Sequence, residues 1–310
     1  MTSRSLINRL TSEIEGDFLS DNFSRGRYST DASIYQLMPV GVVVPKSIND
    51  VEATIKIARE EGLPVLPRGG GTSQNGQAIG EALLIDTTRH LNQVIDFDAE
   101  KKTVCVEPGL VLDELNRFLK PHGLFYPVDV STANRATLGG MTGNNSCGAR
   151  SIRYGNMVHN VLSIEALLAD GSKAHFKKFG EGSENVSEAL STQLLNLGRR
   201  ESKEIDERFP KLLRRVGGYN IDELTKQSPN LGRLLVGSEG TLGFFQKIHL
   251  KLQTIPKEKV LGVCHFPTFY EAMESTQHIV KLDPAAVELV DRTMIDLARA
   301  IPLFAPTVDR

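Results

Sequence analysis

The sequence predicts a mixed α+β fold in a chain long enough for about two domains. Short apolar runs, typical of strands, alternate with segments in which apolar residues recur at helical spacing. Hydrophobic residues make up 40% of the 310 residues, and 27 glycines come in addition, as in ordinary globular domains. This composition excludes a disordered or fibrous protein.

The first part of the chain has the order helix, strand, helix, strand. Ser47, with Asp50 three positions on, resembles a helix cap, and Gly62 is placed to end the helix that follows. The expected elements are a helix at 3–15, a polar irregular segment at 18–38, a strand at 41–45, a helix at 49–61 and a strand at 63–67.

The middle of the chain alternates strands with helices around one segment, 127–155, that lacks periodicity and is rich in glycine. Its expected elements are strands at 82–86, 93–97 and 103–107, a helix at 110–120, a strand at 161–169, charged helical sequence at 183–215 and a strand at 244–252. A new unit is expected after Pro256, with a strand at 260–266, a helix at 269–281, a strand at 286–290 and a helix at 292–300.

Charge and cysteine content exclude several classes of protein. Lys and Arg total 36 against 38 for Asp and Glu, so no global positive field attracts nucleic acid. The three cysteines form no Cys-x-x-Cys pair, which excludes a disulfide framework, a zinc knuckle and an iron–sulfur cluster. Without an apolar run of membrane-spanning length or a signal-peptide core, we expect a cytoplasmic protein, with peripheral contact to a membrane left open.

Three glycine clusters carry the functional signal. They are Pro67-Arg-Gly-Gly-Gly-Thr-Ser, the stretch 137–150, and Gly237-Ser-Glu-Gly-Thr-Leu-Gly. A glycine-rich turn after a strand favours phosphate binding, because consecutive backbone amides can converge on an anion. A lone cluster could equally be a tight turn, but three in order favour a cofactor site.

Two familiar phosphate-binding motifs are absent. The nicotinamide fingerprint Gly-x-Gly-x-x-Gly fails because its sixth position, counted from Gly69, is Gln74. The P-loop fails because no Gly-Lys-Ser or Gly-Lys-Thr occurs in the chain.

In order and spacing, the three clusters resemble the FAD-linked oxidases of the vanillyl-alcohol oxidase and p-cresol methylhydroxylase type. The chain looks most like the branch of D-lactate dehydrogenases, the flavin subunit of glycolate oxidase, and D-2-hydroxyglutarate dehydrogenases. Tyr28-Ser-Thr-Asp-Ala-Ser-Ile-Tyr also resembles that branch.

The resemblance implies an FAD-binding domain of two α+β subdomains that clasp an extended FAD. It divides the chain into an N-terminal helix and arm at 1–38, the FAD-binding domain at 39–255, and the beginning of the family's cap (substrate) domain at 256–310. On this basis we expect the chain to be a piece of a longer protein. Some relatives bind flavin covalently through a His in the first loop, where this chain has Gly71, so non-covalent FAD is expected.

The resemblance also assigns the cofactor site. The first loop would cradle the pyrophosphate, with Arg68 as a fixed cation; the second cluster would line the flavin and its ribityl chain; the third would close over the cofactor. The residues so assigned are Arg68, Gly69, Gly70, Gly71, Thr72, Ser73, Gln74, Gly76, Gln77, Pro127, Thr137, Gly139, Gly140, Gly143, Asn144, Asn145, Gly148, Gly155, Gly237, Glu239 and Gly240.

By resemblance, the activity is oxidation of a small D-2-hydroxy acid such as D-lactate, glycolate or D-2-hydroxyglutarate, with hydride transfer to flavin N5. The alternative is an FAD-binding module or electron-transfer component without its own substrate site. The electron acceptor (a quinone, an electron-transfer flavoprotein or an iron–sulfur region) is not identified by the sequence. Because the family's substrate residues lie mostly further into the cap domain, we expect this chain alone to hold FAD without oxidising substrate.

No catalytic residue is assigned. Cys147 lies in the second cluster without an identifiable base, which favours a small packing residue. His159 has no evident partner and is expected to be structural. The histidines show no ligand spacing, so no metal site is predicted.

Overall fold

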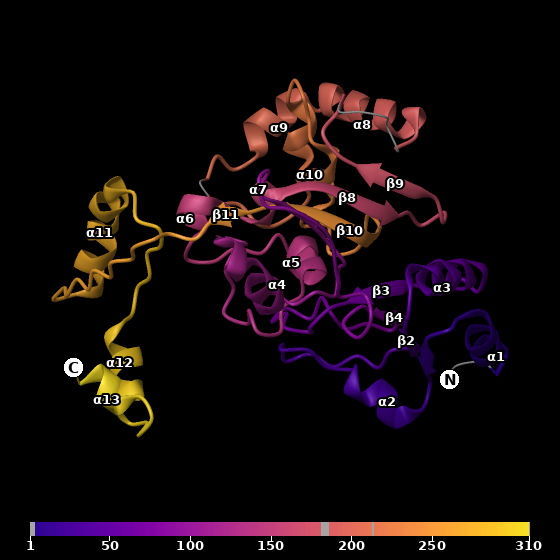
Figure 1. The fold of residues 1–310 in the computed structure, drawn as a ribbon, viewed down its shortest axis with the longest axis horizontal. Helices are drawn as coiled ribbons and strands as arrows, with labels where there is room; N and C mark the ends of the chain where they lie inside the picture. The colour runs from indigo at the N-terminus through magenta and orange to yellow at the C-terminus, as the bar shows by residue number, and fades with distance from the viewer. Residues whose placement is uncertain (1–3, 181–185, 213, 310) are drawn as a thin grey trace.

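The computed structural model describes residues 4–180, 186–212 and 214–309. Within these ranges the chain forms two sheet-based units and a C-terminal arm (Figure 1). The mixed α+β prediction is confirmed.

The N-terminal unit is a four-stranded sheet with the order β1-β2-β4-β3. Strands β2, β4 and β3 are parallel, and β1 is antiparallel at the edge. Its elements are α1 (Arg4–Glu13), β1 (Asp17–Leu19), α2 (Asn22–Arg27), β2 (Gly41–Val44), α3 (Ile48–Glu60), β3 (Val65–Arg68) and β4 (Leu83–Asp86).

The second unit is an antiparallel sheet with the order β5-β6-β10-β8-β9. Its strands are β5 (Val94–Asp98), β6 (Thr103–Val106), β8 (Val161–Leu167), β9 (Lys173–Phe176) and β10 (Phe244–Lys251). Its helices are α4 (Leu112–Leu119), α5 (Leu138–Asn144), α6 (Ser151–Tyr154), α7 (Met157–Asn160), α8 (Glu188–Arg200), α9 (Ser202–Arg208) and α10 (Leu231–Leu235), with short 3₁₀ turns η1 (Lys120–His122) and η2 (Ile221–Thr225). Strand β7 (Leu124–Phe125) pairs with β11 (Gln253–Thr254) beside this sheet.

A small apolar core joins the two sheets. Val51 and Ile55 of α3 and Ile85 of β4 belong to the same buried cluster as Leu167 of β8 and Phe244 of β10. This contact brings the carboxyl end of β3 close to the start of β10. It therefore decides that the three glycine clusters lie near one another.

Two expectations in the first 60 residues need correction. Segment 18–38, expected to be irregular, contains the end of β1 and helix α2, whose first turn is capped by the Asp21 side chain accepting from the Ser24 N–H. Ser47 makes no side-chain cap bond to α3. The Asp50 carboxylate instead accepts the N–H groups of Lys46, Glu15 and Gly16.

The glycine-rich segment 127–155 also differs from expectation, because it contains the short helices α5 and α6. Glycine has low helix propensity, so its pattern concealed a helix that tertiary contacts stabilise. The helical sequence expected at 183–215 is divided into α8 and α9, and its residues 183–185 and 213 lie outside the described residues.

The C-terminal arm has the expected helices but not the expected strands. Helices α11 (Phe269–Ile279), α12 (Arg292–Arg299) and α13 (Ala305–Val308) lie apart from the sheets, in yellow in Figure 1. Residues 260–266 and 286–290 form no strand, since no described segment lies beside them to complete a ladder. Val260 is 97% exposed, and the arm buries little apolar surface.

We expect Asp50→Ala to lower the free energy of unfolding by about 3 kcal/mol, because three backbone donors lose a buried, charged acceptor. The Asp50 acceptor distances are 2.7 Å to Lys46 N, 2.8 Å to Glu15 N and 3.0 Å to Gly16 N, and the residue is 3% exposed. Urea denaturation followed by circular dichroism measures the change, with exposed Lys56→Ala on the same helix as control. Equal stability of the two variants would contradict the role of Asp50.

Candidate functional site

A cleft of about 320 Å³ lies where the loop after β3, helix α5 and the loop before β10 meet. It brings together residues as far apart in the sequence as Pro67 and Phe245. The assigned residues that line it are Arg68, Gly69, Gly70, Gly71, Thr72, Ser73, Gln74, Gln77, Thr137, Gly139, Gly140, Gly143, Asn144, Glu239 and Gly240.

The other assigned residues lie outside the cleft wall: Gly76, Pro127, Asn145, Gly148, Gly155 and Gly237. Gly148 packs against the Asp129 carbonyl, and Gly155 packs against His159. At both positions a side chain would collide with neighbouring protein atoms, so packing within the protein explains the glycine.

The first glycine loop is pressed against residues 135–137. A Cβ on Gly69 would lie 2.1 Å from Thr137 Oγ1, and one on Gly70 would lie 2.3 Å from the Arg135 carbonyl oxygen. Both positions therefore need glycine for the loop to pack, whatever ligand the cleft holds. In the described residues, the backbone N–H groups of residues 70–73 donate no hydrogen bond, so they are available to an acceptor in the cleft.

Arg68 supports this loop from behind. Its guanidinium donates to the carbonyls of Tyr28 (3.1 Å), Ala78 (2.8 Å) and Thr30 (2.8 Å). Its Nη2 lies 2.7 Å from where a Cβ of Gly71 would be, and Gly71 has φ +63°. Burial lowers the pKa of Arg68 below its ordinary value. The side chain holds the loop in shape and adds positive charge near the cleft.

The second cluster presents a helix surface without side chains. Thr137 caps α5 by accepting the Gly140 N–H at 3.2 Å, and Gly139 packs on Pro108, where a Cβ would lie 2.6 Å away. Gly143 differs, because its Cβ would meet nothing closer than Glu239 Cα at 3.8 Å. A methyl group would therefore fit at Gly143, in ordinary contact with the Glu239 backbone, and Gly143 also lines the cleft.

The third cluster closes the cleft with two consecutive residues whose backbone φ angles are positive. Glu239 has φ +50°, and its N–H donates to the Gly143 carbonyl at 3.0 Å. The following Gly240, with φ +80°, would place a Cβ 3.3 Å from Pro67. Burial raises the pKa of the Glu239 carboxyl, and a hydrogen bond with Gln77 opposes that rise. Glu239, an exposed residue, thus lines the cleft from a strained backbone position.

Sequence reasoning missed several residues of the cleft wall. Thr87 could have been found, because β3 and β4 are parallel and pair Arg68 with Asp86, so the residues that follow lie at one edge. Phe244 and Phe245 add an apolar wall that only the packing of β10 reveals. The lining residues without an individual assignment are Pro67, Asn75, Ala78, Thr87, Pro108, Val130, Thr132, Ala136, Met141, Ser146, Gly243, Phe244 and Phe245. Of these, Pro67, Met141, Ser146 and Gly243 lie within the three clusters.

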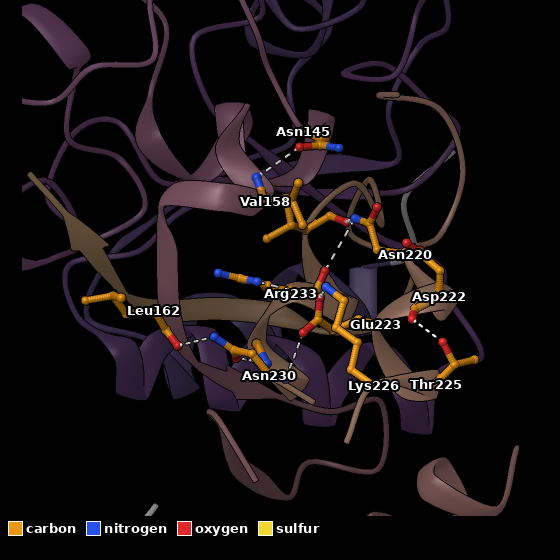
Figure 2. Close-up of polar contacts among 12 residues, drawn as sticks. Asn145, Val158, Leu162, Asn220, Asp222, Glu223, Thr225, Lys226, Asn230 and Arg233 are labelled. Carbon is orange, nitrogen blue, oxygen red and sulfur yellow. Dashed lines mark hydrogen bonds and ion pairs between the residues drawn. The ribbon is translucent and has the colours of Figure 1, made fainter. Parts of the chain in front are cut away.

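Two buried polar atoms near the cleft have no hydrogen-bond partner: Asn145 Nδ2 and Ser238 Oγ. Asn145 has φ +52°, and its Oδ1 accepts the Val158 N–H at 3.1 Å (Figure 2). A Cβ on Gly237 would lie 3.3 Å from Asn145 Cβ, so the second and third clusters meet here. Unpaired buried polar atoms are costly, and neither of these two residues lines the cleft.

Reactive groups are scarce around the cleft. Cys147 is partly buried and lies outside the cleft wall. His159 also lies outside it, and its Nδ1 accepts the Asn156 N–H at 3.0 Å. The described residues contain no group of three or more His, Cys, Asp or Glu that could hold a metal ion. The described cleft wall is instead rich in glycine and in threonine and serine hydroxyls.

Comparison with known proteins agrees with this geometry. Residues 39–177 match the FAD binding domain family, and residues 255–306 match the C-terminal domain of FAD linked oxidases. The chain belongs to the FAD-linked oxidase family. The resemblance inferred from the glycine clusters is confirmed.

The curated relatives are longer than this chain. D-2-hydroxyglutarate dehydrogenase of Escherichia coli (strain K12) is 35% identical in an alignment 300 positions long, which covers 92% of this chain and 29% of that protein. A probable mitochondrial D-lactate dehydrogenase of Danio rerio is 33% identical over 88% of this chain and 47% of its own length. The chain thus spans less than half of each.

A solved structure of alkyldihydroxyacetonephosphate synthase has the same fold. It superposes with a TM-score of 0.65 at 20% identity, over 92% of this chain and 48% of that one. Together with the family matches, this confirms the predicted FAD-binding domain followed by the start of a C-terminal domain. Among the described residues, no helix is long and apolar enough to span a membrane.

We expect Glu239→Gln to raise the melting temperature by about 1–2 °C at pH 8 and to have no effect near pH 4. A carboxyl whose pKa is raised by burial stabilises the fold fully below its unfolded pKa and loses that contribution as pH rises through its folded pKa. Glutamine cannot ionise, so the variant avoids the loss. Thermal melts from pH 4 to 8 measure it, with exposed Glu81→Gln as control. A pH-independent difference would contradict the burial argument.

Proposed function

We propose that the chain binds FAD non-covalently in the cleft and forms the flavin-binding part of a D-2-hydroxy-acid dehydrogenase. The observation that carries this proposal is the row of N–H groups at residues 70–73 that have no partner in the protein, in a cleft that Gly143 of α5 also lines. Unpaired amides suit the FAD diphosphate, and a surface without side chains suits a flat ring or its ribityl chain. The family match supports the identity of the cofactor.

In this proposal each cluster has its own task. Residues 69–73 and the hydroxyls of Thr72 and Ser73 would hold the diphosphate. Helix α5 would lie along the cofactor at Gly140 and Gly143, and Asn144 would supply a side-chain amide. Glu239 is better placed to accept a cofactor hydroxyl than to lie beside a phosphate, because an ionised carboxylate repels phosphate.

The substrate class rests on the named relatives. D-2-hydroxyglutarate and D-lactate dehydrogenases are relatives that align with 92% and 88% of this chain. We propose an N-terminal arm at 1–38, an FAD-binding domain at 39–255 and a cap domain that starts at 256. When bound, FAD supplies the two-electron acceptor that takes hydride from the hydroxyl-bearing carbon. The chain's own residues would position the flavin and exclude water from the apolar wall at Phe244 and Phe245.

We also propose a cellular location and a set of candidate electron acceptors. Cys105, Cys147 and Cys264 are free thiols, which favours a reducing compartment such as the cytoplasm. The electron acceptor is proposed as a quinone, an electron-transfer flavoprotein or an iron–sulfur region. The described residues offer no feature that selects one of them.

Gly143→Ala tests the cofactor position. The added methyl meets no protein atom closer than 3.8 Å, and alanine favours helices, so the fold is expected to be as stable or slightly more so. FAD affinity is expected to fall by at least about tenfold, because the methyl takes space needed by the ligand. Fluorescence titration of apoprotein with FAD measures it. Gly26→Ala, in open space on α2, is the matched control. Unchanged FAD affinity in the Gly143 variant would show that the cofactor does not bind beside Gly143.

Non-covalent binding is tested by denaturation. The position of Gly71 in the first loop offers no side chain for a covalent bond to the flavin. Acid precipitation of the FAD-loaded chain is therefore expected to leave all the flavin in the supernatant, where absorbance measures it. Yellow pellet that survives repeated washing in denaturant would show a covalent link.

The activity is tested with the FAD-loaded full-length protein under anaerobic conditions. D-lactate and D-2-hydroxyglutarate are mixed with it separately, and the oxidised flavin band is followed, with the L enantiomers as controls. Bleaching by a D acid alone supports the dehydrogenase. Stable flavin absorbance with every acid, in a protein that binds FAD, would favour an FAD-binding module instead.

A further inference from the structure

A second cavity, of about 430 Å³, lies between α7, α9, η2 and α10, and shares no lining residue with the FAD cleft. Its wall is rich in nitrogen donors. They are His159, Lys211, Arg215, Asn220, Lys226 and Arg233. Nothing in the proposed function uses this cavity.

The central feature of the cavity is one buried carboxylate shared by two cations. Glu223 is 4% exposed, and its carboxylate accepts the Asn230 N–H at 3.0 Å. It also pairs with Lys226 Nζ and, at 3.7 Å, with Arg233 Nη1 (Figure 2). Because one negative charge faces two positive charges, the group keeps an excess charge of +1.

The other charges of the wall are already balanced. Arg215 Nη2 pairs with Asp222 at 2.6 Å, and the Arg215 guanidinium also lies over the Phe209 ring. Lys211 Nζ pairs with Asp206 at 3.0 Å. The excess positive charge therefore belongs to Lys226 and Arg233.

His159 adds an uncharged donor next to these two cations. Its Nδ1 accepts the Asn156 N–H, so the proton of the neutral ring is on Nε2. Burial, and then the charges of Arg233 and Lys226, lower the pKa of His159 below its ordinary value. At neutral pH the ring is therefore a donor that adds no charge.

Arg233 also has unused hydrogen-bonding capacity. Its Nε is buried and has no hydrogen-bond partner, although its Nη1 faces Glu223. The surrounding backbone is held in place by side-chain amides: Asn220 Nδ2 donates to the Val236 carbonyl at 2.7 Å, and Asn230 Nδ2 donates to the Leu162 carbonyl at 2.8 Å. The donors are thus organised before any ligand arrives.

We propose that this cavity binds a small oxyanion, a phosphate or a carboxylate, between Lys226, Arg233 and His159. One anion would neutralise the excess charge left by Glu223 and accept hydrogen bonds from the ammonium and guanidinium groups and from His159 Nε2. The inference stands independently of FAD, because the two cavities have separate walls.

Inorganic phosphate is the probe. It is titrated calorimetrically into the full chain at pH 7.5 and constant ionic strength, with and without saturating FAD. One saturable site is expected in both conditions. Lys226→Met and Arg233→Met are each expected to lower phosphate affinity by about tenfold or more, because each removes a charge-assisted hydrogen bond. Lys203→Met and Arg208→Met, on the exposed side of α9, are the matched controls and are expected to bind as the unchanged chain does.

Lys226→Arg changes the same position but keeps the positive charge, and it is expected to retain phosphate binding. Binding in this variant would show that the loss in Lys226→Met comes from the missing charge and not from unfolding. Competition with acetate distinguishes the two ligand chemistries: displacement at similar concentration identifies a carboxylate site, and retention identifies a phosphate site. Absence of saturable phosphate binding would overturn the proposal. So would phosphate affinity that stays the same as in the unchanged chain in both methionine variants. Loss of phosphate binding when FAD is added would also overturn it, because it would place the anion in the FAD cleft.

Discussion

The close contact between the first glycine loop and residues 135–137 is the constraint on which the site depends. Gly69 and Gly70 have no room for a Cβ there, so the loop packs directly on the segment that leads into α5. Because β3 carries the loop and the second sheet unit carries α5, this contact sets the width of the cleft. The apolar cluster of Val51, Ile85 and Phe244 holds the two units at the distance that the contact requires.

In the first glycine loop, the charged side chain of Arg68 binds protein carbonyls, and the backbone N–H groups have no protein partner. The Arg68 guanidinium donates to three backbone carbonyls and so stiffens the loop. In the proposed site, the N–H groups of residues 70–73 therefore make the ligand contacts. Backbone amides bind an anion without the entropy loss of a long side chain. Glu239 is the acidic side chain among the described lining residues, and its backbone, with φ +50°, donates to the Gly143 carbonyl.

The two sheet units and the C-terminal arm differ in how much of their apolar surface they bury among their own residues. The two sheet units bury continuous apolar cores, whereas the C-terminal arm exposes Val260, Leu261 and Leu303. A strand is stable only beside a partner, and a helix of this length gains most of its stability from a packed face. Residues 256–309 therefore carry strand-like patterns without strands, while the amphipathic helices α11 and α12 persist as local structure.

Sequence alone determined the class of fold, most strands and helices, and the family, because apolar periodicity and glycine spacing are local signals. It could not place α5, since a helix rich in glycine needs tertiary contacts such as Gly139 on Pro108. It could not show that Arg68 turns toward backbone carbonyls, nor that His159 and Glu223, far apart in the chain, line one cavity with Arg233. Those arrangements depend on how the sheets pack, because side-chain partners distant in sequence are chosen only when the chain folds.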